Sequence, residues 1–190
     1  MYRNVVLMMM SVILMCSCGS KHDKTLTKDG KKVLIVYYSW SGNTKVLATQ
    51  IQKLTGGKMV EIEMEKPYTK VYGDCVKQAR EEITKGVKPA IKTKIADLSQ
   101  YDVIFIGSPN WCSTIAPPVA TFLTQNDFSG KTVAIFQTNG GGGMAHCESD
   151  AKKDCPKAIF LKGIAIDGSN VTTAEPQVQQ WLKDIDIIEK

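Results

Sequence analysis

Hydroxyl and amide side chains that could hold an anion follow one another around a single glycine: Ser39, Trp40, Ser41, Gly42, Asn43 and Thr44. The apolar run 33–37 precedes them and predicts a strand buried on both faces. Leu47, Ile51 and Leu54 follow at helical spacing. The run therefore falls where a strand gives way to a helix, whose free N–H groups and dipole favour a bound phosphate. The alternative is a polar turn that only caps the helix.

The composition of this turn limits the kind of phosphate. No Lys-Ser or Lys-Thr pair follows a spaced pair of glycines, so the loop of nucleoside triphosphatases does not fit. Gly42 is the one glycine in the turn, so the fingerprint of dinucleotide-binding proteins is missing as well. A phosphate monoester held without a metal or a lysine fits these residues best.

Two further segments with binding character follow apolar strands. The first comes after residues 103–107 and contains Pro109, Asn110, Trp111 and Cys112. The second comes after residues 132–136 and contains Thr138, Asn139, Gly140, Gly141 and Gly142. An indole can cover one face of a flat ligand, and glycines let backbone N–H groups approach it. The alternatives are a tryptophan that plugs the end of the sheet and a mobile glycine linker.

In their order and spacing, the three segments resemble the flavin-binding loops of flavodoxins, and the likeness extends over roughly residues 31–190. The resemblance implies that the turn 39–44 holds the phosphate of flavin mononucleotide (FMN) and that Trp111 stacks on the isoalloxazine ring. It also implies that the glycine segment passes the pyrimidine side of the ring.

The chain differs from these relatives in two places. Cys112 stands where a second tryptophan is frequent, and it is either a small packed residue or a redox-active thiol close to the ring. No aromatic residue precedes His146 in the glycine segment, so one ring face is either open or covered by Met144.

Strand and helix patterns alternate along the rest of the chain. Further strands are predicted at 59–63 and 158–166, the latter with Gly163 as a candidate break, and helices at 72–83, from Pro117, and at 178–185. This alternation predicts an α/β fold, a three-layer, doubly wound parallel sheet of five strands with helices on both sides. The strand order 2-1-3-4-5 is implied by the resemblance to flavodoxins and not by the periodicity.

The N-terminal region has the layout of an export signal. Arg3 precedes an apolar run over residues 5–15, and small residues and cysteines follow it. We expect residues 1–17 to be a signal peptide of the bacterial lipoprotein type, cleaved before a lipidated Cys18; the alternative is an ordinary cleaved signal. Residues 18–30 are polar and predict a tether, with the folded domain over 31–190. The protein is then an exported lipoprotein anchored in a membrane of the bacterial cell envelope.

The charge and the cysteines restrict partners and cross-links. The formal net charge of +5 over 190 residues differs from the strongly acidic soluble flavodoxins and does not indicate nucleic acid. The Cys and His spacing does not indicate a metal site. Cys147 and Cys155 would lie about 12 Å apart on one continuous helix and remain thiols. They could form a disulfide if the helix begins after Cys147.

These features predict a membrane-tethered, FMN-binding electron-transfer flavoprotein whose partner is a redox protein or a small-molecule electron acceptor. The alternative is an FMN-dependent NAD(P)H or quinone oxidoreductase that acts on a small acceptor. A third possibility, a binding module that has lost the cofactor, would usually show a damaged phosphate turn. The three segments contain no evident general acid, base or nucleophile, so we assign no catalytic residue.

Overall fold

The structure is a computed structural model, and it describes residues 27–189. Its helices and strands follow one another along the chain as β1 (Val33–Tyr37), α1 (Asn43–Thr55), β2 (Lys58–Glu61), α2 (Tyr72–Lys85), β3 (Val103–Trp111), β4 (Thr114–Ile115), α3 (Pro117–Gln125), β5 (Thr132–Asn139), α4 (Cys147–Asp154), β6 (Ile159–Phe160), β7 (Ile164–Asp167), the 3-10 turn η1 (Val171–Thr173) and α5 (Glu175–Asp184).

The strands form one parallel sheet in the order β2-β1-β3-β5-β6, with β7 also paired to β5 and the short β4 antiparallel to β3. Because β5 is the fourth long strand and β6 and β7 are two pieces of the fifth, this order confirms the predicted 2-1-3-4-5. The fifth strand breaks at Gly163, as expected. A Cβ atom at this position would lie 2.6 Å from the carbonyl oxygen of Ile135, so a larger residue would clash with β5.

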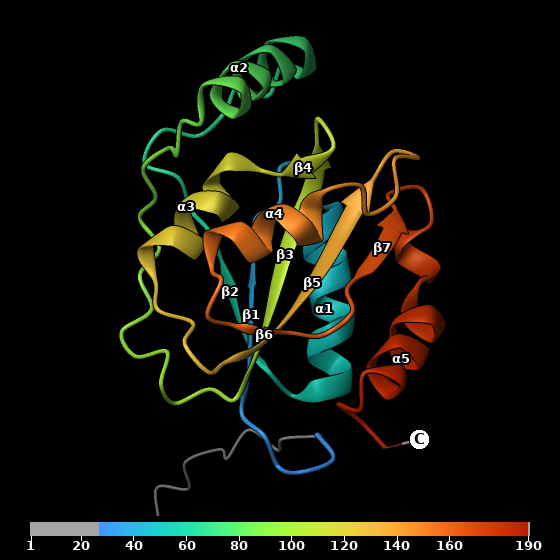
Figure 1. Ribbon diagram of the computed structural model, residues 1–190. Helices are drawn as coiled ribbons and strands as arrows, with labels where there is room; N and C mark the ends of the chain where they lie inside the picture. Colours follow the sequence, from blue (N-terminus) through green and yellow to red (C-terminus); the bar gives the residue numbers. More distant parts are fainter. Residues whose placement is uncertain (1–26, 190) are drawn as a thin grey trace, which may run out of the picture.

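Both faces of the sheet are buried, as the apolar strand sequences predict. Leu34 and Val36 of β1 belong to one core, whereas Val33, Ile35 and Tyr37 belong to the other. Helices α1 and α5 supply the second core, and α3 and α4 cover the opposite face (Figure 1). The predicted three-layer architecture is therefore confirmed.

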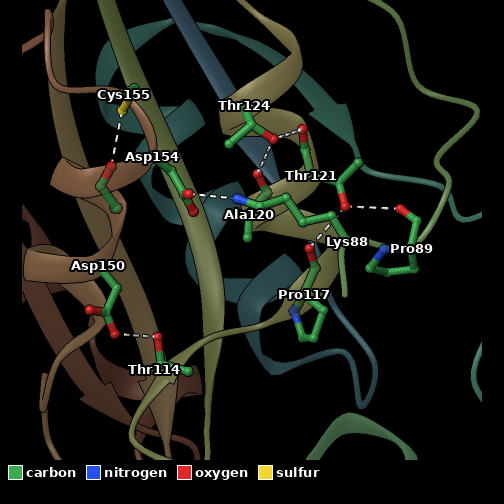
Figure 2. Close-up of polar contacts among 11 residues, drawn as sticks. Lys88, Pro89, Thr114, Pro117, Ala120, Thr121, Thr124, Asp150, Asp154 and Cys155 are labelled. Atoms are coloured by element: carbon green, nitrogen blue, oxygen red, sulfur yellow. Dashed lines mark hydrogen bonds and ion pairs between the residues drawn. The ribbon is translucent and has the colours of Figure 1, made fainter. Parts of the chain in front are cut away.

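Helix α2 departs from this layering. Figure 1 shows it beyond the ends of the strands and away from the flat faces of the sheet. Cys75 and Ala79 are its buried residues, so a narrow stripe attaches it to the rest of the molecule. At its far end the chain is held by two contacts, which Figure 2 shows: Lys88 Nζ lies 2.6 Å from an Asp154 carboxylate oxygen, and the Thr121 hydroxyl donates to the Pro89 carbonyl at 2.9 Å.

Residues 27 and 28, which fall in the predicted tether, contact the folded domain. Thr27 is buried, and its hydroxyl donates to the Lys31 carbonyl oxygen at 2.9 Å. The backbone N–H of Lys28 donates to the carbonyl oxygen of Ile187 at 3.0 Å, which ties this segment to the C-terminal end of the domain. The predicted signal peptide, Cys18 and the first part of the predicted tether lie outside the described residues. Within residues 27–189, no helix combines the length and the apolar character needed to cross a membrane.

The cysteines around α4 are free thiols. The helix begins at Cys147 itself, and both Cys147 and Cys155 are buried against the sheet. The Cys155 thiol donates to the carbonyl oxygen of Ala151 at 3.2 Å. The structure therefore agrees with packed thiols and not with a disulfide between these two residues.

Candidate functional site

The turn before α1 has the geometry of an anion site. Gly42 occupies the N-cap with φ 98° and ψ −20°, a left-handed conformation that glycine adopts without strain, and it supplies no side-chain cap. Ser39 Oγ accepts one N–H of the first turn, from Lys45, at 3.3 Å. Ser39 therefore provides one cap from within the turn, whereas the N-cap residue itself carries no side-chain acceptor.

The turn opens onto a cavity of about 620 Å³ at the carboxyl ends of the strands. This is the edge at which open α/β sheets bind their ligands. Ten of the predicted site residues line the cavity: Trp40, Ser41, Asn43, Pro109, Asn110, Trp111, Cys112, Thr138, Asn139 and Gly140. The structure thus brings together side chains from all three predicted segments. Five predicted residues do not line the cavity: Ser39, Gly42, Thr44, Gly141 and Gly142.

Thr44 has a different environment from the one that the phosphate prediction assumes. Its side chain is 1% exposed, and its hydroxyl lies 2.9 Å from the hydroxyl of Thr138. Thr44 belongs to the first turn of α1 and Thr138 to the end of β5. The hydroxyl of Thr44 therefore joins two of the binding segments, and a contact of this side chain with a phosphate stays a prediction.

The glycine segment is folded against its neighbours, which argues against a mobile linker. Asn139 Oδ1 accepts the backbone N–H groups of Gly141 at 2.8 Å and Gly143 at 3.1 Å. The carbonyl oxygen of Gly143 in turn accepts the side-chain amides of Asn110, at 2.9 Å, and Gln137. These bonds fasten the glycine segment to the ends of β3 and β5.

Trp111 belongs to a strand and not to a loop, because β3 continues through the predicted binding segment. Pro109 pairs with Thr138 of β5, and Trp111 pairs with Thr114 across a two-residue turn. Both turn residues have positive φ, 51° at Cys112 and 70° at Ser113, as tight hairpins of the primed types require. Pairing on both sides of β3 thus fixes the backbone that carries Trp111 and exposes Cys112.

Aromatic residues hold the indole of Trp111 in place. The centroid of its ring lies 5.0 Å from that of Tyr68 and 5.7 Å from that of Tyr38, both in edge-to-face arrangements. The half-buried indole therefore packs against the protein and also lines the cavity. Met144 is packed against the core and does not line the cavity, so it is not placed to cover the second face of a bound ring.

Sequence reasoning missed two walls of the cavity. One is the inner side of α2, with Tyr72, Cys75, Val76, Ala79 and Arg80. The other is the turn after β7, with Asp167, Gly168 and Ser169. The Asp-Gly-Ser turn at the end of the fifth strand could have been predicted to line the site, because ligands bind at the carboxyl ends of the strands in such sheets. The position of α2 had no such signal.

The turn after β7 closes tightly on the phosphate turn. A Cβ atom at Gly168 would lie 2.5 Å from the side-chain amide nitrogen of Asn43, and the N–H of Gly168 donates to the Asn139 carbonyl at 2.7 Å. Hydrogen bonds from the hydroxyl and the N–H of Ser169 lower the pKa of Asp167. Its carboxylate is therefore ionised at neutral pH and can accept hydrogen bonds from a ligand hydroxyl.

Cys75 and Arg80 are further ionisable residues of the cavity. Burial raises the pKa of the Cys75 thiol, which keeps this group protonated. No ion pair or hydrogen bond is formed by the guanidinium of Arg80 with any residue between 27 and 189. The cavity can therefore bind and orient a ligand through the Asp167 carboxylate and the Arg80 guanidinium.

Comparisons with known proteins agree with this geometry. The model of a protein family described as flavodoxin matches residues 32–185. A crystal structure of a protein assigned as a flavoprotein from Bacteroides eggerthii is similar with a TM-score of 0.73 and 29% identity, covering 82% of this chain and 98% of that one. A counterpart from Bacteroides uniformis has a TM-score of 0.72 and 29% identity, covering 80% and 98% of the two chains.

A third structure was solved with a ligand. It is a flavoprotein from Lactobacillus acidophilus in complex with FMN, with 30% identity and a TM-score of 0.61 over 75% of this chain and 97% of that one. The family match covers most of the chain and includes the strands whose ends form the cavity. The chain therefore belongs to the flavodoxin family.

Proposed function

We propose that this protein is an FMN-binding flavoprotein that transfers electrons while tethered to a membrane through a lipid on Cys18. The observation that carries the proposal is the glycine-led start of α1, whose N-cap residue has no side-chain acceptor and which opens onto a cavity between three strand ends. An anion at the helix start and a flat group between the strand ends match the two parts of FMN.

The cofactor is FMN, and the residues of the cavity fit it. The N–H groups at the start of α1, with Ser41 and Asn43, would hold its phosphate. Trp111 would lie against the ring system, and Asn110, Asn139 and Gly140 would border it. The carboxylate of Asp167 would accept from the hydroxyls of the chain between ring and phosphate.

When bound, FMN supplies the transfer of one or two electrons. The protein's own contribution is to bind and orient the cofactor and to exclude water from it. The hydrogen bonds from Asn110 and Gln137 to the Gly143 carbonyl hold the two flanking segments at a set separation. Because Asp167 stays ionised and Cys75 stays protonated, neither is poised to exchange a proton, which favours a carrier over a catalyst of proton-coupled chemistry.

The membrane tether rests on the sequence of the N-terminal region. The apolar run 5–15 and the following small residues and cysteines have the pattern of an exported bacterial lipoprotein. A Cys18→Ser substitution is expected to move the protein from the membrane fraction to the soluble fraction. Unchanged membrane attachment would contradict the anchor at this cysteine.

A second candidate function is an FMN-dependent oxidoreductase that acts on a small acceptor. The cavity extends past the three flavin-binding segments to the wall formed by α2, which leaves space beside the proposed ring position. Anaerobic mixing of the FMN-loaded protein with NADPH or a quinol tests this alternative. Fast bleaching of the flavin absorption bands would favour the oxidoreductase over the carrier.

The spectrum of the purified protein tests the cofactor directly. Protein prepared without added flavin should show flavin absorption bands or should bind FMN in a titration. Ser41→Ala should weaken FMN binding about tenfold, because one hydrogen bond to a charged phosphate is lost. Ser149→Ala in α4, whose hydroxyl bonds to the His146 carbonyl, is the matched control and should leave the affinity unchanged. Colourless protein that refuses FMN would overturn the proposal.

A further inference from the structure

The wall that α2 contributes to the cavity differs in chemistry from the other walls. The residues that it presents are Tyr72, Cys75, Val76, Ala79 and Arg80. Ligand pockets are lined mainly by apolar and aromatic side chains with a few placed polar or charged groups, and this wall has that composition. The three strand-end segments, in contrast, present hydroxyls, amides and backbone, which suit a phosphate and a flavin ring.

Arg80 is the cationic residue of this wall and the one best suited to bind an anionic ligand. Among residues 27–189 its exposed guanidinium has no carboxylate partner, and of the three cations of α2 (Lys77, Arg80 and Lys85) Arg80 is the one that lines the cavity. A guanidinium is planar and presents a fork of N–H donors that fits carboxylates and sulfonates. An arginine that lines a cavity without a protein partner can meet an anionic ligand without breaking an existing ion pair.

The position of Arg80 separates it from the phosphate turn. Trp40 in that turn contacts the first residue of α2, Tyr72, with ring centroids 6.1 Å apart. Arg80 lies eight residues later, which is about 12 Å farther along the helix axis. Arg80 therefore lies well away from the turn that is proposed to hold the cofactor phosphate.

Contacts at both ends of α2 keep this wall in place. The indole N–H of Trp40 donates to the Thr69 carbonyl at 3.0 Å, just before the helix. The hydroxyl of Tyr68 donates to the carboxylate of Glu82 in the last part of the helix, and Tyr68 also packs on Trp111. The same aromatic cluster thus positions the predicted ring-stacking residue and the helix that carries Arg80.

From these contacts we propose that the α2 wall is a second subsite, beside the flavin, for a flat aromatic molecule that carries a negative charge. Trp111 and Cys112 would border the ligand on the flavin side, Val76 and Ala79 would contact its apolar surface, and Arg80 would bind its anionic group. The inference rests on the proposed FMN site, because the flavin forms one side of the subsite.

Calorimetric titration of the full-length, FMN-loaded protein tests this subsite with two probes of matched shape. Naphthalene-2-sulfonate carries the charge, and naphthalene-2-sulfonamide is neutral. We expect the sulfonate to bind more tightly than the sulfonamide. Arg80→Gln should weaken sulfonate binding about tenfold and leave sulfonamide binding unchanged, whereas Arg80→Lys should retain part of the preference.

Lys77→Gln is the matched control, since Lys77 is an exposed cation on the same helix that does not line the cavity. It removes the same charge and should leave both affinities unchanged. Equal binding of the two probes, or equal losses in Arg80→Gln and Lys77→Gln, would overturn the subsite.

The affinity for FMN, measured separately in the same variants, distinguishes this failure from a failure of the cofactor site. It should be the same in Arg80→Gln as in the unsubstituted chain. A weaker FMN affinity in Arg80→Gln would place Arg80 in the cofactor site and overturn the second subsite. Absence of FMN binding in the unsubstituted chain would instead refute the proposed function.

Discussion

At the scale of single residues, the site depends on side chains that hold other segments as much as on those that face the cavity. Thr44 is the clearest case, because its hydroxyl is buried and shared with Thr138. The sequence places Thr44 in a phosphate turn, whereas the structure places its hydroxyl between the phosphate turn and the end of β5. The distinction can be measured.

Thr44→Val keeps the shape of the side chain and removes its hydroxyl. We expect the free energy of unfolding of the apoprotein to fall by about 1–2 kcal/mol, because the buried hydroxyl of Thr138 loses its partner. Urea denaturation measures this change. Thr49→Val is the matched control, since Thr49 bonds to the Lys45 carbonyl of its own helix at 2.9 Å, and it should change stability by less than about 0.5 kcal/mol. Equal effects of the two substitutions would contradict the role assigned to Thr44.

Gly42 is a second residue whose backbone conformation matters. Its φ of 98° is one that side-chain-bearing residues rarely adopt, although a Cβ atom would meet nothing within 4 Å. Gly42→Ala is therefore expected to lower the free energy of unfolding by about 1–2 kcal/mol through backbone strain alone.

The same substitution at Gly73 has the opposite expectation. Gly73 lies in the first turn of α2, has an ordinary φ and also has free space around it, so Gly73→Ala should be neutral or stabilise by about 0.5–1 kcal/mol. Thermal unfolding of both variants checks the pair. A loss at both positions would show that strain is not the cause.

At the scale of elements, α4 is held by the thiols at its two ends. Burial raises the pKa of Cys147 to about 12 and that of Cys155 to about 11, from an ordinary value of 9.0. A raised pKa in the folded state means that the unfolded chain loses these protons first as the pH rises. The stability supplied by the neutral thiols is therefore complete below about pH 9 and is lost as the pH approaches about 11–12.

This loss can be isolated by comparing two variants. Cys155→Ala should cost stability at pH 8, and the difference from the unsubstituted chain should narrow by about 1–3 kcal/mol as the pH rises to about 11. Val119→Ala, in the same core and without a titrating group, should show a constant difference over this range. A constant difference for Cys155→Ala as well would refute the titration of this thiol.

Some of the helices and strands could be predicted from the sequence, and others could not. The apolar runs of β1, β3 and β5 and the helix starts at Asn43 and Pro117 follow from periodicity and from the punctuation of Gly and Pro. The extension of β3 to Trp111 could not be predicted in this way, because Ser108, Pro109 and Asn110 are poor strand formers. They become a strand because β5 and β4 pair with them on either side.

The candidate site also has a part that could be predicted from the sequence and a part that could not. Its three strand-end segments could be predicted because they have unusual compositions directly after apolar strands. The wall from α2 could not be predicted from the sequence. The apolar stripe of a helix predicts that the helix packs against the protein, but it does not identify the surface that it packs against. Cys75 and Ala79 predict a helix face, but not that this face meets both the core and the cavity at the end of the sheet.

At the scale of the whole molecule, the segment before β1 is part of the fold. Thr27 is buried and Lys28 bonds to the backbone of Ile187, so the two ends of the described chain support each other. This arrangement predicts that the domain needs residues 27–30 even though their composition resembles a tether.

Two truncated forms test this prediction. A chain that starts at residue 27 should unfold at nearly the same urea concentration as the longer protein without its signal peptide. A chain that starts at residue 31 should lose about 1–2 kcal/mol, because the hydrogen bonds of Thr27 and Lys28 are removed. Equal stability of the two forms would place the start of the folded domain at residue 31.

The outlying position of α2 has a consequence for how such a protein can diversify. Most of its residues are exposed, and Cys75 and Ala79 are the ones that join the core beside the sheet. Substitutions at its cavity-lining positions outside that core, Val76 and Arg80, can therefore alter which molecules are accepted with little risk to folding. The same scaffold could acquire new ligands by drift at these positions while the strand-end segments of the cavity remain as they were.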